Sequence, residues 1–120
     1  MNQKYSALID NRWITGQQTF ESRNPADNRQ VLGVFGEADK DTIRKAAQAA
    51  RKAYASWSKT PAPVRAGIIQ NFGKLLESNK EAFARTVSKE IGKPFRESLG
   101  SVQEAIDTCN FFVSEGRRLY

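Results

Sequence analysis

The spacing of apolar residues changes near residue 39, and this change limits most strongly the folds open to the chain. Up to residue 36, short apolar runs alternate with turn-forming residues, whereas from residue 39 onward apolar residues recur at steps of three and four. The first pattern is typical of strands and the second of amphipathic helices, because side chains repeat every two residues in a strand and every 3.6 in a helix. The sequence therefore predicts an α+β chain, in which a β-hairpin and a strand over residues 1–36 precede about four helices over residues 39–120.

The N-terminal segment carries the signals of several short extended pieces. They lie at residues 7–9, 12–14, 19–22 and 31–35. Asp10 and Asn11 separate the first two pieces, and both residue types tolerate the positive φ of a tight hairpin turn. Asp27 and Asn28 are turn formers as well, so we expect a turn there, ahead of the strand at residues 31–35.

Each expected helix has its own start signal. Asp39 can cap the first helix, and Pro63 suits the first turn of the second. Ser78 and Glu81 have the spacing of a capping box, which predicts the start of the third helix. Pro94 opens the fourth, which we expect to run as one helix to the last residue, over about 39 Å.

Cys109 is the only cysteine and therefore the only candidate thiol nucleophile. It belongs to the apolar seam of the fourth helix, whose members are Phe95, Leu99, Val102, Ile106, Cys109, Val113 and Gly116. A reactive thiolate needs a nearby positive charge or a helix N-terminus, and Cys109 has neither close to it in the sequence. We interpret it as a buried packing residue, since a functional role would require a partner brought to it by the fold.

Two carboxylate pairs are the other candidates for acid–base chemistry. Glu97 is paired with Glu104, and Glu104 with Asp107 at a spacing that places both on one helix face. Such pairs are usually solvated surface groups, and we assign no catalytic role to them.

The composition excludes several classes of site. The chain has no histidine and a single cysteine, which excludes an imidazole base, a histidine-containing zinc site, an internal disulfide and a cysteine cluster for metal. No apolar run approaches the length that spans a bilayer, and the first residues lack the apolar core of a signal peptide, so we expect a soluble, cytoplasmic protein without a membrane partner. The net charge of +6 is interleaved with acids, and we expect no nucleic-acid partner.

Five segments, taken in order, resemble motifs of the NAD(P)-dependent aldehyde dehydrogenases. They are residues 8–13 (an "I-N-G-x-W" hairpin), 24–27 (the "N-P-A-T/D" turn), 46–51 (the alanine-rich first helix), 63–65 (the start of a "P-x-x-R" helix) and 90–94 ("E-x-G-K-P"). The resemblance covers nearly all of residues 7–120. Two turns depart from the family pattern. This chain has Asp10-Asn11 where the family has Asn-Gly, and Asp27-Asn28 where the family has Thr-Gly. Both pairs remain able to form turns.

This resemblance implies that residues 1–120 are the N-terminal part of a cofactor-binding domain within the family's α/β fold, with no complete second domain. The parent enzyme would oxidise an aldehyde or semialdehyde to the carboxylic acid with NAD or NADP, as a homo-oligomer. In the family the catalytic cysteine, the glutamate base and the dinucleotide-binding elements come later in the chain. We therefore expect this chain alone to be an inactive fragment that binds no cofactor. Residues 102–107 and 115–119 look most like bacterial semialdehyde-oxidising members.

The resemblance also implies part of a monovalent cation site. Many family members hold a monovalent cation near the "N-P-A" turn, using carbonyls just before it and an acid of the "E-x-G-K-P" motif. The matching positions here are Ser22, Arg23 and Glu90. A hard cation prefers such oxygen ligands, although Glu90 is most simply a surface acid at the end of a helix.

A self-contained interaction module is the alternative from another class. A hairpin with a helical bundle, binding an acidic partner through its basic surface, would need none of the catalytic residues that the chain lacks.

Overall fold

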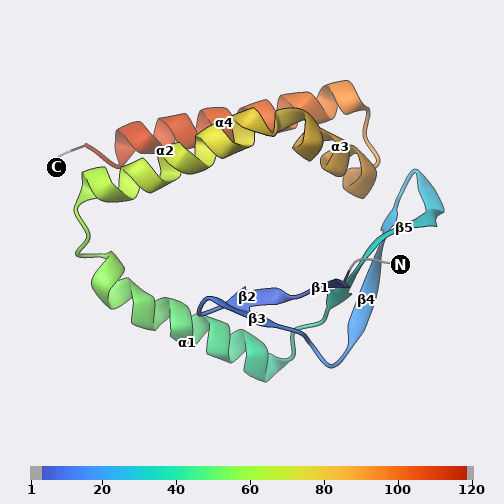
Figure 1. Cartoon of the computed structure of the whole chain (residues 1–120), viewed down its shortest axis with the longest axis horizontal. Helices are drawn as coiled ribbons and strands as arrows, with labels where there is room; N and C mark the ends of the chain where they lie inside the picture. Colours follow the sequence, from blue (N-terminus) through green and yellow to red (C-terminus); the bar gives the residue numbers. More distant parts are fainter. Residues whose placement is uncertain (1–3, 119–120) are drawn as a thin grey trace. The chain divides into compact units, whose positions relative to one another are not determined.

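The computed structural model describes residues 4–118, and the chain divides into two compact units, Met1–Lys59 and Thr60–Tyr120 (Figure 1). The described part of the first unit contains β1 (Lys4–Tyr5), β2 (Ala7–Ile9), β3 (Arg12–Ile14), β4 (Thr19–Asn24), β5 (Asp27–Gly36) and α1 (Lys40–Trp57). The described part of the second contains α2 (Ala62–Ser78), α3 (Lys80–Ile91) and α4 (Phe95–Glu115). This order of strands followed by four helices confirms the predicted α+β class.

The strands of the first unit form two small sheets. In the larger sheet β5 is central, with β1 parallel on one side and β4 antiparallel on the other. The smaller sheet is the antiparallel hairpin of β2 and β3, and its turn residues Asp10 and Asn11 have φ of 51° and 58°. The hairpin predicted from these two turn residues is therefore confirmed.

The turn between β4 and β5 is shorter than the sequence predicts. Asn24 pairs with Asp27 across the ladder, so Asp27 and Asn28 already belong to β5 and only two residues make the turn. The side chain of Asn24 accepts a hydrogen bond from the main-chain N–H of Ala26 at 2.9 Å. This local bond reverses the chain before Asp27, which is why the turn expected at Asp27 and Asn28 is wrong.

Aromatic side chains cross the larger sheet in one row. The ring of Phe35 stacks on Tyr5 with centroids 4.7 Å apart and on Phe20 with centroids 5.6 Å apart. The three residues occupy neighbouring strands, with Phe35 paired to Tyr5 on one side and to Phe20 on the other. Cross-strand aromatic pairs of this kind stabilise a sheet, so the row joins β1, β5 and β4.

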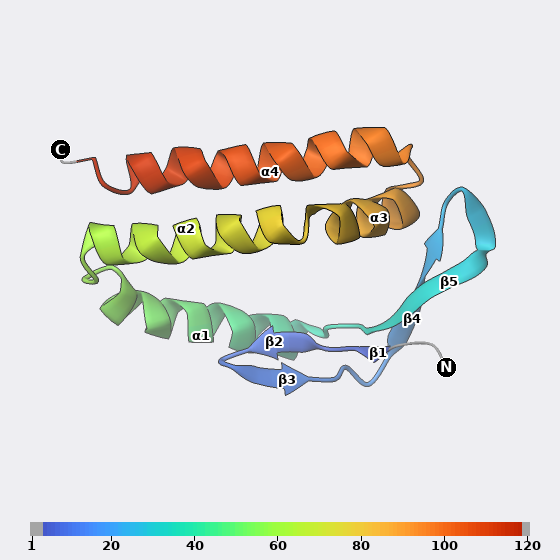
Figure 2. The same cartoon turned by 45° about the horizontal axis from the view of Figure 1, so that its top comes forward.

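Helix α2 packs along α4 in the second unit, and α3 continues the layer that α2 begins (Figure 2). Ala84, Val102 and Ile106 are the buried centre of this packing, with partly buried Leu76, Val87, Phe95 and Leu99 around them. Where α2 crosses α4, a Cβ atom on Gly73 would lie 3.1 Å from the Cβ of Cys109. The small residue lets the two helix backbones approach closely at that point.

Helix α3 does not begin with the predicted capping box, and α4 ends before the last residue. Ser78 is the last residue of α2 and its hydroxyl donates to the Leu75 carbonyl at 3.1 Å, so Ser78 and Glu81 form no capping box. A single residue, Asn79, joins α2 to α3, which leaves Ser78 in helical backbone rather than the extended conformation that a cap requires. Helix α4 ends at Glu115, because Gly116 begins a tighter final turn in which the N–H of Arg117 bonds to Ser114. Residues 119 and 120 lie outside the described residues.

Candidate functional site

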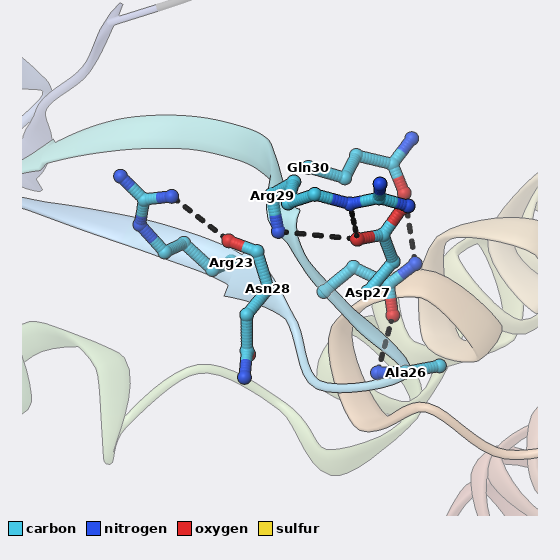
Figure 3. A network of polar contacts seen from close by, with 7 residues as sticks. Arg23, Ala26, Asp27, Asn28, Arg29 and Gln30 are labelled. Carbon is cyan, nitrogen blue, oxygen red and sulfur yellow. Dashed lines mark hydrogen bonds and ion pairs between the residues drawn. The ribbon is translucent and has the colours of Figure 1, made fainter.

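The turn between β4 and β5, which follows the two strand positions of the expected cation site, is held by side-chain hydrogen bonds (Figure 3). Arg23 donates to the main-chain carbonyl of Asn28 at 2.8 Å and also pairs with Glu21. Asn24 donates to the side chain of Gln30 at 2.8 Å. The bonds of Arg23 to Asn28 and of Asn24 to Gln30 run between β4 and β5, so they hold the two strands together at the turn.

Asp27 and Arg29 form an exposed ion pair at the same turn. The Arg29 Nε atom lies 2.8 Å from Asp27 Oδ1, and the main-chain N–H of Arg29 donates to the same oxygen at 3.2 Å. Hydrogen bonding from Arg29 lowers the pKa of Asp27 below its ordinary value of 3.8. The carboxylate is therefore charged at neutral pH, and its hydrogen bonds with Arg29 stabilise the backbone next to the turn.

The residues of the expected cation site fall in different parts of the chain. Ser22 and Arg23 are successive residues of β4, at a register irregularity in the ladder with β5. Glu90 is an exposed residue of α3, in the second unit. Among residues 4–118 there is no group of three or more histidine, cysteine, aspartate or glutamate side chains that could hold a metal ion. The cation site thus stays a prediction.

The segment that follows Glu90 connects α3 to α4. Gly92 ends α3 with φ of 75° and its N–H bonds to the Ser88 carbonyl. This left-handed conformation favours glycine, which explains why the motif has glycine there. Lys93 donates from Nζ to the hydroxyl of Ser101, and Pro94 precedes α4 and accepts from the N–H of Ser98 at 3.1 Å. The "E-x-G-K-P" motif at residues 90–94 therefore has a structural role, because it holds the connection between α3 and α4.

Polar contacts between α3 and α4 are a feature that sequence reasoning missed. Ser88 donates to the fully buried Ser98 at 2.8 Å, and Lys80 donates to Gln103 at 2.6 Å. The guanidinium of Arg85 lies 4.8 Å from the centre of the Phe95 ring. The only hint in the sequence is that polar residues border the apolar seam of α4. Their partners lie up to 23 positions away, beyond the reach of a local pattern.

The candidate catalytic side chains have the environments that the sequence predicts. Cys109 is buried in the α2–α4 contact, beside Gly73. Glu97, Glu104 and Asp107 are exposed on α4, and Asp107 accepts a hydrogen bond from Gln103 at 2.9 Å. The burial of the thiol agrees with the predicted packing residue, and the exposure of the acids agrees with the predicted surface groups.

A family model matches most of this chain. The model described as "Aldehyde dehydrogenase family" matches residues 13–120. The chain belongs to the aldehyde dehydrogenase family. Each helix described within residues 4–118 is too short or too polar to serve as a membrane span.

Curated relatives include two bacterial semialdehyde dehydrogenases. The N-succinylglutamate 5-semialdehyde dehydrogenase of Photorhabdus laumondii is 40% identical over 107 residues, which are 88% of this chain and 21% of that protein. Malonate-semialdehyde dehydrogenase 1 of Geobacillus kaustophilus is 36% identical over 105 residues, 86% of this chain and 21% of that protein. The chain thus spans about a fifth of the length of these relatives.

A solved structure has the same fold over almost the whole chain. The NAD-dependent aldehyde dehydrogenase of Sinorhizobium meliloti superimposes with a TM-score of 0.92 at 26% identity, covering 99% of this chain and 24% of that protein. The benzaldehyde dehydrogenase of Corynebacterium glutamicum, also described as NAD-dependent, has a TM-score of 0.88 at 28% identity, covering 94% of this chain and 25% of that protein. The resemblance deduced from five short motifs is confirmed by these matches.

Proposed function

We propose that this chain is the N-terminal part of an enzyme that oxidises an aldehyde or semialdehyde to the carboxylic acid with NAD or NADP. The observation that carries the proposal is the family match over residues 13–120. The semialdehyde dehydrogenases among the relatives support a semialdehyde as the substrate. We also propose that this enzyme is a cytoplasmic homo-oligomer and that it has no nucleic-acid or membrane partner. It is favoured over a self-contained interaction module because the family match extends through both units.

Within that enzyme, we propose that residues 1–120 belong to the cofactor-binding domain and that the helices cover its outside. The exposed apolar face of α2 supports this packing: Val64, Ile68, Phe72 and Leu75 are 54%, 50%, 53% and 62% exposed. These side chains recur at steps of four and three on one side of the helix, as expected of a face that packs against a further layer. A sheet covered by helices is the layer arrangement of α/β domains.

The chain alone is expected to oxidise no aldehyde and to bind neither NAD nor NADP. It has no histidine, its one thiol is buried, and its paired acids are exposed on α4. The test is to incubate the purified chain with each nucleotide and a panel of aldehydes, including malonate semialdehyde, while following the absorbance of the reduced nucleotide. Turnover above a protein-free control that disappears in Cys109→Ser would contradict the expectation.

A chimera tests the role in the parent enzyme. Residues 1–120 would replace the corresponding segment of the Photorhabdus laumondii relative, and oxidation of that enzyme's own semialdehyde would be measured. We expect the chimera to fold and to retain activity, whereas a chimera with an unrelated α+β segment of equal length should not. A soluble, folded chimera without activity would count against the proposed function.

The monovalent cation site is proposed for the same full-length context. The ladder of β4 with β5 changes register on both sides of Arg23, with the extra residues on β5, and this local disruption of the ladder supports main-chain carbonyl ligands at Ser22 and Arg23. The carboxylate of Glu90 is exposed and is a suitable ligand for a hard cation. In the chimera, Glu90→Gln should weaken any stabilisation by potassium or sodium ions, measured as a shift in the unfolding temperature with cation concentration. Glu97→Gln is the matched control and should leave that shift unchanged.

A further inference from the structure

We draw no further inference here: the strongest candidate, the apolar face of α2 formed by Val64, Ile68, Phe72 and Leu75, already belongs to the domain packing proposed above, and nothing in the structure points to another occupant.

Discussion

Gly67 and Gly73 both lie inside α2 but have different surroundings, so substitutions at the two positions can be compared directly. A Cβ on Gly73 would lie 3.1 Å from the Cβ of Cys109, whereas a Cβ on Gly67 would meet nothing within 4 Å. Gly67→Ala should stabilise the chain by about 0.5–1 kcal/mol, because alanine is the better helix former. Gly73→Ala should destabilise it by about 1 kcal/mol, since overpacking against a neighbouring helix outweighs that gain. Urea unfolding of both variants measures the difference, and equal stabilisation by both would refute the close contact.

The burial of Cys109 predicts slow thiol chemistry in the folded chain. The side chain lies between α4 and Gly73 of α2, so a thiol reagent must wait for the helices to separate. Labelling should be slow in native buffer and fast in denaturant, as followed by the absorbance of the released reagent group. A cysteine placed at the exposed Thr108 in a Cys109→Ala background is the control and should react fast in both conditions. Equal rates for Cys109 in the two conditions would show that it is accessible.

The start of α1 shows how one side chain stabilises an element. Asp39 accepts the N–H of Thr42 at 2.7 Å and so satisfies one of the free donors in the first turn. Hydrogen bonds from Thr42 lower the pKa of Asp39 below 3.8, its value in an unfolded chain. A lowered folded pKa means that the contribution is complete above the unfolded pKa and is lost as the pH falls through the lower folded value.

Substitutions at Asp39 test this pH dependence. Asp39→Asn should still cap α1 at neutral pH, but its thermal stability should fall less than that of the parent chain between pH 7 and about 3. Asp39→Ala should lose helix content at both pH values, because its side chain accepts no hydrogen bond. Circular dichroism follows both changes. The ion pair of Asp27 remains in all three proteins, so its acid sensitivity is a shared background. An Asn variant that loses stability with acid as steeply as the parent would exclude the cap as the cause.

For the whole molecule, the uncovered apolar face of α2 predicts association of the isolated chain. Its four side chains are at least half exposed, and a contiguous apolar surface of this kind drives association despite a net charge of +6. Light scattering should show an oligomer or a loosely packed state. Replacing Ile68 and Phe72 together by glutamine should reduce the apparent mass, whereas Lys74→Gln on the polar side of α2 should not. A monomer with sharp, cooperative unfolding would contradict the prediction and would favour a self-contained module.

The kinds of element were readable from the sequence because their causes are local. The hairpin at Asp10 and Asn11, the cap at Asp39 and the stop at Gly92 depend on backbone preferences of residues within a few positions. The errors arose where two local signals compete: Asn24 reverses the chain before the turn formers Asp27 and Asn28, and helix α2 runs through Ser78. The family followed from the order of five motifs, whereas the cation site did not follow from geometry, since its residues lie in two separately packed units.

The period at which apolar residues recur is a property of the sequence, and it predicts the helices of the second unit. The buried side of α4 is the apolar seam that the sequence predicts, whereas the buried side of α2 depends on the tertiary packing. On α2 the regular apolar stripe from Val64 to Leu75 is exposed, while Ala66 and Gly73 face α4. The side of a helix that becomes buried depends on which element packs against it and on how closely the two backbones approach. Small residues permit the close contact with α4, and the larger apolar side chains are left for a different layer.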